Sequence, residues 1–193
     1  VMYKVFYKDI PKIAQEMSMT EEEAGRVYRY ECFEDVRKEL GYNKIAVAHH
    51  QDDQAETVLF QLLRGSGFRG LGGMRAKNAD VIRPLLAVKK QEIVETLEKK
   101  GQSYCTDSTN NEDEYARNQI RNHLIPYLRE NLQKETVSHI AKTASYMQDV
   151  TEFIDLQTDM VWESVIECKD GRPKEIKAYL SEMKKLHVVL QRE

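Results

Sequence analysis

Short apolar runs between polar segments predict the strands of this chain. The alternating stretch from Met2 to Tyr7 predicts a strand. The runs 45–48 and 81–82 are short, apolar and bounded by polar residues, which favours buried strands of a parallel sheet. Pro84 ends the second of these runs, because proline cannot donate to a strand ladder.

Helical periodicity separates these strands. Thr20 followed by Glu23 has the form of a capping box and predicts a helix that runs to about Leu40, with Gly41 as its stop. Three further helices are expected, over about 53–63, 89–100 and 113–130. The first carries apolar residues at helical spacing: Ala55, Val58, Leu59, Leu62 and Leu63. Gly101 should end the second, and Pro126 should kink the third. Because strands alternate with helices, the sequence predicts an α/β layer with a parallel sheet.

The pattern changes after residue 131, where we place a domain boundary. Apolar residues then step by three and four from Val137 to Val165, which predicts one long amphipathic helix. The segment Cys168–Pro173 should break it, and a last helix is expected from about Lys174.

Composition excludes several classes of protein. The chain has 193 residues, of which 41% are hydrophobic and 32% charged, as in a globular protein, and no apolar run approaches the roughly 18 residues of a membrane helix. The net charge is −3, but residues 60–130 hold 12 Lys and Arg against 9 Asp and Glu, a mildly basic stretch that suits phosphate. Cys32, Cys105 and Cys168 form no C-x-x-C pair, which argues against a zinc site or a disulfide framework and indicates a reducing cytoplasm.

The densest polar cluster is 49–57, where a predicted strand ends and a helix begins. Ligands of open parallel sheets bind at this edge. Asp53 and Glu56 are three apart on one helical face, and we expect them to face a crevice or solvent, beside His49 at the strand tip. Two other interpretations remain open: Asp53 as a helix N-cap with Glu56 as its capping partner, or imidazoles and carboxylates that bind a divalent metal.

Two further motifs point to anionic ligands. The glycine-rich stretch 65–73 contains G-x-G-x-x-G, but the dinucleotide fingerprint needs a strand before it and a helix after it, and neither is expected here. Its backbone N–H groups could still bind an anionic or planar ligand, or it is a plain surface loop. Arg117 and Arg121 lie four apart on one helical face, which suits either phosphate or surface salt bridges.

Taken together, these segments closely resemble the tRNA(Ile)-lysidine synthetase family of the N-type ATP-pyrophosphatase (PP-loop) superfamily. The order and spacing of the matching stretches fit over about residues 1–130. The helical remainder is similar to the start of the family's next domain. The matching stretches are Glu22–Tyr30, His49–Thr57, Leu63–Leu71, Arg83–Leu86, Asp107–Asn110 and Arg117–Arg121.

The resemblance implies an RNA-modifying ligation. ATP, accompanied by Mg²⁺, adenylates the wobble cytidine of tRNA(Ile) with anticodon CAU at its C2 oxygen, and the ε-amine of L-lysine displaces AMP to give lysidine. The family is often dimeric, so a homodimer is expected. Carried over by the match, the catalytic residues are His49, Asp53, Glu56, Arg29 and Arg121, and the nucleotide-binding residues are Arg64, Gly65, Gly67 and Arg117.

One family motif is missing. The phosphate-binding S-G-G-x-D-S loop is absent from the 193 residues, and the resemblance implies that it lies upstream of Val1. Residues 1–130 then correspond to the C-terminal part of the catalytic domain, and 131–193 to a helical linker and the start of a substrate-binding domain. We therefore expect the isolated chain to bind ATP poorly and to be inactive.

Two other functions compete with this interpretation. One is a metal-dependent phosphohydrolase built on His49, His50, Asp52 and Asp53. The other is a tRNA-binding relative without catalytic activity. A tRNA-thiolating enzyme fits less well, since such enzymes typically carry catalytic C-x-x-C cysteines.

Overall fold

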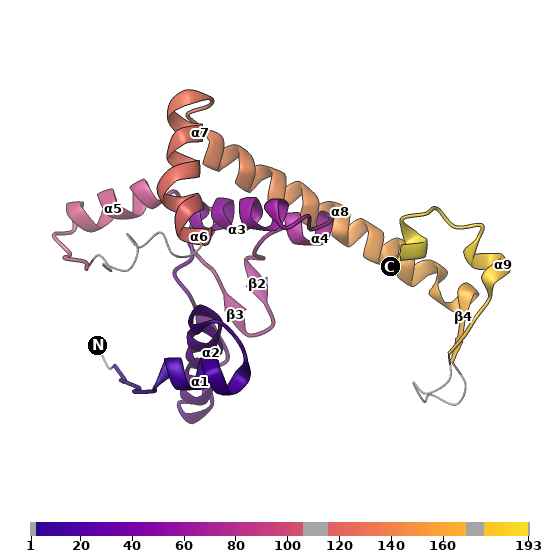
Figure 1. Cartoon of the computed structure of the whole chain (residues 1–193), viewed down its shortest axis with the longest axis horizontal. Helices are drawn as coiled ribbons and strands as arrows, with labels where there is room; N and C mark the ends of the chain where they lie inside the picture. Colours follow the sequence, from indigo (N-terminus) through magenta and orange to yellow (C-terminus); the bar gives the residue numbers. More distant parts are fainter. Residues whose placement is uncertain (1–2, 106–115, 169–175, 193) are drawn as a thin grey trace. The chain divides into compact units, whose positions relative to one another are not determined.

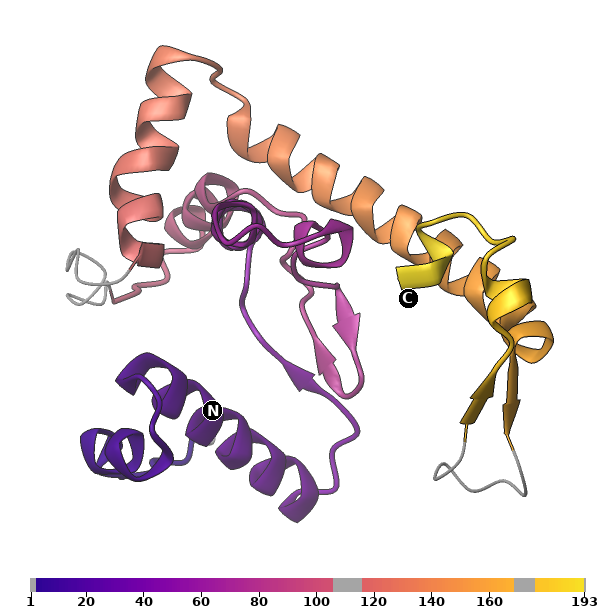
Figure 2. The ribbon, with the colours of Figure 1, turned by 45° about the vertical axis from the view of Figure 1, so that its right-hand side comes forward.

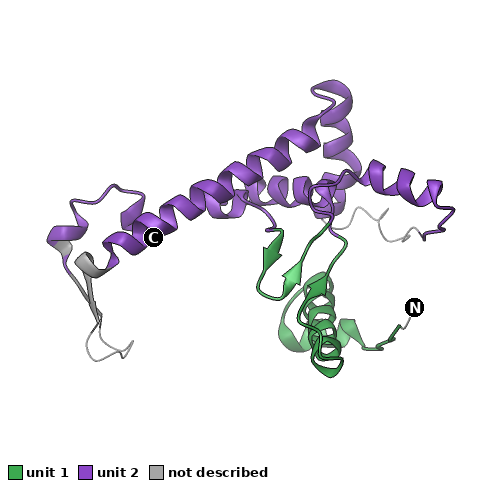
Figure 3. Ribbon diagram, turned by 180° about the vertical axis from the view of Figure 1, so that it is seen from behind, with its two compact units in different colours: residues 1–48, 76–84 green, residues 49–75, 85–193 purple. Residues whose placement is uncertain are grey.

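The computed structural model describes residues 3–105, 116–168 and 176–192. The chain divides into two compact units (Figure 3). The first comprises residues 1–48 and 76–84, and the second comprises residues 49–75 and 85–193.

The first unit combines two helices with a small mixed sheet (Figures 1 and 2). The sheet order is β1-β3-β2, in which β1 is parallel to β3 and β2 is antiparallel to it. The parallel pairing sets Ile45 opposite Val81, which confirms the predicted parallel arrangement. The elements are α1 (Ile10–Met17), α2 (Glu21–Glu39), β1 (Ile45–Ala46), β2 (Lys77–Asn78) and β3 (Val81–Ile82).

Helix α2 begins and ends where its local signals predict. Thr20 Oγ1 accepts the Glu23 N–H at 3.2 Å, and the Thr20 N–H donates to Glu23 Oε2 at 3.1 Å. This reciprocal pair satisfies two of the backbone donors that a helix start leaves unpaired. Gly41 follows the helix at φ +68°, a conformation that glycine adopts without steric cost.

Three features of this unit differ from the expectation. Residues 3–9 form neither strand nor helix, so the strand predicted at the start is wrong over the residues described; alternation alone makes no strand without a neighbour to pair with. Strand β1 is half-buried at Ile45 and exposed at Ala46 rather than buried, because the ladders are only two residues long. Helix α1 and strand β2 were not predicted.

The second unit is mostly helical. Helix α3 packs along α8, and α4 contacts both helices. Its core contains Ala55, Ile120, Ile125 and Val137, with partly buried apolar residues around them. The elements are α3 (Gln51–Leu63), α4 (Phe68–Leu71), α5 (Lys90–Lys99), α6 (Ala116–Gln119), the π-helix η2 (Ile120–Leu124), α7 (Ile125–Asn131), α8 (Thr136–Val165), β4 (Ile166–Cys168), β5 (Ile176–Ala178), α9 (Leu180–Met183) and the 3₁₀ turn η4 (Leu190–Arg192).

The long helices follow the periodic pattern. Helices α5 and α8 confirm the predicted segments. The described part of the segment expected at 113–130 is helical, and its wide π turn η2 comes just before Pro126. In a regular α-helix the proline ring would collide with the carbonyl four residues back, so the wider turn accommodates it.

Other expectations for this unit are wrong. Residues 176–178 pair antiparallel with 166–168, and the α-helical residues described after them are 180–183, so the helix expected from about Lys174 is wrong over the described residues. The glycine-rich stretch includes the helical turn α4. Leu62 and Leu63 are exposed rather than part of the buried face of α3. Within the described ranges, no helix has the length and apolarity needed to cross a membrane.

Candidate active site

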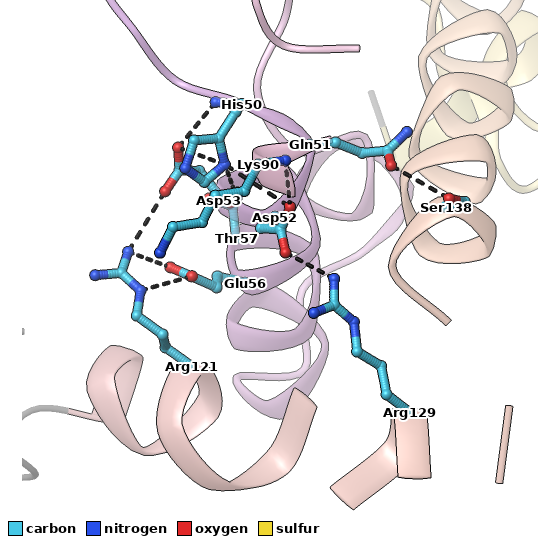
Figure 4. Close-up of polar contacts among 10 residues, drawn as sticks. All are labelled: His50, Gln51, Asp52, Asp53, Glu56, Thr57, Lys90, Arg121, Arg129 and Ser138. Atoms are coloured by element: carbon cyan, nitrogen blue, oxygen red, sulfur yellow. Dashed lines mark hydrogen bonds and ion pairs between the residues drawn. The ribbon is translucent and has the colours of Figure 1, made fainter. Parts of the chain in front are cut away.

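His50 and Asp53 fix the start of α3 (Figure 4). The Asp53 N–H donates to His50 Nδ1 at 3.4 Å, and the His50 N–H donates to Asp53 Oδ2 at 2.9 Å. This capping box corrects the alternative in which Asp53 is the N-cap and Glu56 its partner. It holds the Asp53 carboxylate in the first helical turn, where the helix dipole favours negative charge.

Glu56 forms a bidentate ion pair with Arg121. Arg121 Nε and Nη2 donate to Glu56 Oε1 and Oε2, each at 2.7 Å, and Nη2 also lies 3.4 Å from Asp53 Oδ1 (Figure 4). The Glu56 side chain is only 4% exposed, so the expectation that it faces a crevice or solvent is wrong. A carboxylate is tolerated at such a buried position when a guanidinium satisfies both of its oxygens.

Burial sets the protonation of this cluster. Burial raises the pKa of Glu56, against the hydrogen bonds and charge of Arg121, which lower it, and the negative charge of Asp53 raises it further. The hydrogen bonds from Arg121 to Glu56 in turn raise the pKa of Arg121. Asp53, Glu56 and Arg121 together carry a net charge of −1 when ionised, and the nearby positive charge of Arg117 also lowers the pKa of Glu56. The two carboxylates outnumber the one guanidinium bonded to them, which favours a cation over an anion at Asp53.

Asp52 connects the start of α3 to two other helices. Its Oδ1 accepts from Arg129 Nη2 of α7 at 2.7 Å, and its Oδ2 accepts from the Lys90 N–H at the start of α5 at 3.2 Å. Beside it, Gln51 Oε1 accepts from Ser138 Oγ of α8 at 3.2 Å. Sequence reasoning named Asp52 only as a metal ligand and missed this role, since both partners lie far along the chain.

Arg117 of α6 precedes Arg121 by one helical turn and contacts α3 at Thr57. Its Nη2 donates to Thr57 Oγ1 at 3.4 Å, while the Thr57 hydroxyl donates to the Asp53 carbonyl oxygen at 2.9 Å. Both arginines of the predicted pair therefore face α3. They contact a hydroxyl and carboxylates within the protein.

The nucleotide-binding residues expected in the glycine-rich loop lie at the other end of α3. Arg64 follows Asp53 by 11 residues, about 16 Å along a helix, and its guanidinium lies 4.2 Å from the centre of the Phe60 ring. Gly65 has φ +75° and Gly67 is the N-cap of α4. The structure thus separates this group from the carboxylates.

Two glutamines hold the end of the loop. The Gln54 amide Nε2 donates to the Met74 carbonyl at 3.0 Å, and its Oε1 accepts the Met74 N–H at 2.7 Å. Gln148 Nε2 of α8 donates to the Gly72 and Met74 carbonyls at 2.6 and 3.0 Å. Gly73 between them has φ +59°, and a Cβ there would lie 2.8 Å from Gln54 Oε1, so only glycine fits. Sequence reasoning did not identify this clamp.

The other predicted residues fall elsewhere. His49 is half-buried immediately before the His50 cap. Arg29 lies on an exposed position of α2, in the first compact unit. The matching stretch Asp107–Asn110 lies outside the described residues.

The metal-dependent alternative gains no support from this geometry. Among the described residues, no group of three or more His, Cys, Asp or Glu is arranged to hold a metal ion. His50 Nδ1 already accepts the Asp53 N–H.

The family model for the PP-loop domain matches residues 3–128. The chain belongs to the PP-loop domain family. This membership confirms the resemblance and the α/β class inferred from the sequence. The match includes α3, η2 and the greater part of α7, so the whole Asp53–Glu56–Arg121 cluster lies inside the PP-loop domain.

Similar proteins are named tRNA(Ile)-lysidine synthase. That of Caldanaerobacter subterraneus subsp. tengcongensis is 37% identical over 188 residues, covering 97% of this chain and 40% of the relative. That of Bacteroides thetaiotaomicron is 44% identical over 137 residues, covering 71% and 32%. That of Chlorobaculum tepidum is 38% identical over 156 residues, covering 81% and 47%. The PP-loop chain thus spans between about a third and a half of the length of these relatives.

Proposed function

We propose that this chain carries the lysine-binding part of a tRNA-modifying ligase site, one that attaches L-lysine to the wobble cytidine of tRNA(Ile) with anticodon CAU. The names of the similar proteins support the reaction class. The cluster of Asp53, Glu56 and Arg121 is the observation that carries the proposal, because it provides a site for one cation inside the PP-loop domain.

The two carboxylates have different roles in this proposal. Asp53 is 20% exposed and only weakly held by Arg121, so it is the carboxylate that binds the lysine ammonium. Glu56 is nearly inaccessible and holds Arg121 in place. His49 and Arg29 are proposed site residues from the family match alone.

The amine becomes a nucleophile only after it loses a proton. Asp53, the more exposed carboxylate of the cluster and the one that binds the ammonium, accepts this proton. The neutral amine then attacks C2 of the adenylated cytidine. A C–N bond forms, the bond between C2 and the adenylated oxygen breaks, and AMP leaves with that oxygen.

The described residues do not form a complete ATP site. Arg121 is occupied by Glu56, Arg117 contacts Thr57, and the glycine-rich loop lies at the far end of α3. The use of ATP with Mg²⁺ is therefore proposed from family membership, as are a cytoplasmic location and a homodimer. Residues 131–193 are proposed to link the PP-loop domain to a substrate-binding domain.

Lysine incorporation tests the proposal. The product of the complete reading frame that contains residues 1–193 is incubated with ATP, Mg²⁺, labelled lysine and a CAU-anticodon tRNA transcript. We expect incorporation, and we expect Asp53→Asn to raise the KM for lysine at least tenfold while the affinity for tRNA stays the same. Asp149→Asn, at an exposed position of α8, is the matched control. An inert wild-type enzyme, or an unchanged KM in Asp53→Asn, would refute the proposal.

A further inference from the structure

A groove further along α3 from the carboxylate cluster combines aromatic rings with positive charge. It has a volume of about 660 Å³ and lies between the C-terminal half of α3 and the helical segment from α6 to α7. Phe60, Leu63 and Arg64 line one wall, and His123 and Tyr127 line the other. Among its described lining residues there is no Asp or Glu, although the whole chain is acidic.

Tyr127, Leu63 and Arg64 of this groove are accessible. Tyr127 is 57% exposed, and Leu63 is exposed as well. Arg64 is also exposed, with its guanidinium over the Phe60 ring at 4.2 Å from the ring centre. Contiguous exposed apolar groups are uncommon on a surface that binds nothing. A planar, anionic ligand suits this lining, because it can stack on the rings and pair with the cations.

The groove continues the proposed lysine site along the same helices. Asp53, Thr57, Phe60 and Arg64 succeed one another at steps of three and four on one face of α3. From Asp53 to Phe60 is seven residues, about 10 Å. Nucleotides of a strand are at least about 3.4 Å apart, so a base no more than about three nucleotides from the target cytidine spans this distance.

We infer that this groove binds an unstacked nucleobase of the same RNA strand that presents the target cytidine to Asp53. The inference rests on the proposed function, which puts that cytidine near Asp53. Unpaired RNA bases stack on aromatic side chains and on arginine planes, as the lining of this groove provides. Arg64 supplies the positive charge that the adjoining phosphates need, and the absence of carboxylates from the described lining removes the repulsion that an RNA strand would otherwise meet.

Binding measurements on paired variants of protein and RNA test the inference. The product of the complete reading frame is titrated with CAU-anticodon tRNA, both unmodified and with single abasic sites up to three nucleotides on either side of the target cytidine. We expect Tyr127→Ala to raise the Kd about 5- to 100-fold, the range for loss of one stacked base, and Tyr127→Trp to retain affinity. At one position, the abasic site should raise the Kd of the wild-type protein by a similar factor. The same abasic site should not raise the Kd of Tyr127→Ala any further.

The matched control is Tyr146→Ala, since Tyr146 of α8 is 53% exposed and lies outside the groove. Both tyrosines are at the surface, so neither substitution should unfold the chain. Arg64→Ala gives a second, independent loss of affinity.

Three results would overturn the inference. The first is a Kd for Tyr127→Ala within twofold of wild type, or a loss of affinity at every abasic position that adds in full to the loss from Tyr127→Ala. The second is a loss of ATP affinity in place of RNA affinity, which would make the groove a mononucleotide site. The third is a change of oligomeric state in sedimentation, which would make it a protein contact. RNA binding that depends on Tyr127 in an enzyme that incorporates no lysine would support the groove and refute only the proposed function.

Discussion

Replacing Arg121 with methionine tests whether the buried Glu56 carboxylate depends on its partner. The substitution removes both 2.7 Å hydrogen bonds to Glu56 and leaves the buried charge uncompensated. Removal of one partner from a buried pair costs about 3–5 kcal/mol of folding free energy. Arg121 itself is 30% exposed, so water reaches part of the vacated space. We therefore expect a loss near the lower limit, about 3 kcal/mol at pH 8.

Removing the other partner should cost less. Glu56→Gln leaves Arg121 charged but partly hydrated, and the Gln carbonyl still accepts one hydrogen bond. A cost of about 1–2 kcal/mol is expected. The double variant Arg121→Met with Glu56→Gln should then be more stable than Arg121→Met alone, because it contains no buried charge. Such non-additivity is the signature of direct coupling between neighbouring groups.

The sign of the pH dependence follows from the raised pKa of Glu56. Burial holds this pKa above its value in the unfolded chain, and the loss of Arg121 raises it further. The folded state then binds more protons than the unfolded state, so stability falls as the pH rises from the unfolded pKa through the folded one. Arg121→Met should therefore be closest to wild type near pH 4.5 and furthest from it at pH 8.

Urea unfolding at these two pH values measures the effect. Arg129→Met is the matched control on the neighbouring helix: Arg129 is 43% exposed, and Asp52 keeps its bond from the Lys90 N–H, so a loss of about 1 kcal/mol or less is expected. The reasoning is refuted if Arg121→Met lies within 1 kcal/mol of wild type at pH 8, or if the double variant is no more stable than the single one.

Three further predictions concern local structure. Gly73→Ala should cost about 2–3 kcal/mol in thermal unfolding, against about 1 kcal/mol for Gly65→Ala, because both have positive φ but only Gly73 also meets a neighbour, the Gln54 amide; equal costs would contradict this. Asp52→Asn should speed amide hydrogen exchange in the first turn of α5, because the Asp52 carboxylate accepts the Lys90 N–H there. Unchanged exchange would contradict a role of Asp52 in connecting α3 to α5. Arg37 lowers the pKa of Glu34 to about 2, so the stability from this pair is present above pH 4.5 and lost toward pH 2; Glu34→Gln should flatten that acid loss in urea titrations, and an unaltered acid profile would refute it.

Predictions from local sequence succeeded where the deciding contacts span only a few residues. The Thr20–Glu23 capping box and the stop at Gly41 delimit α2, and helical spacing predicts α8. The family match likewise depends on short motifs in order. The site residues themselves remain proposals, although Asp53, Glu56 and Arg121 do meet in the structure.

Predictions failed where a distant partner decides. The stretch at residues 3–7 alternates like a strand but forms no strand ladder with the described residues. The pairing of β4 with β5 replaces part of the helix expected from about Lys174. Tertiary contacts also decide which distant residues meet the start of α3, namely Arg121 and Arg129.

The sequence by itself therefore determined helix α2 through its capping box, the parallel pairing of two strands and the membership of the PP-loop family. The tertiary structure decided that Glu56 is buried, that Asp52 connects three helices and that His50 caps α3. The physical reason is that a carboxylate takes its protonation and its role from the groups around it. For Glu56, the decisive group is a guanidinium 65 residues away in the chain.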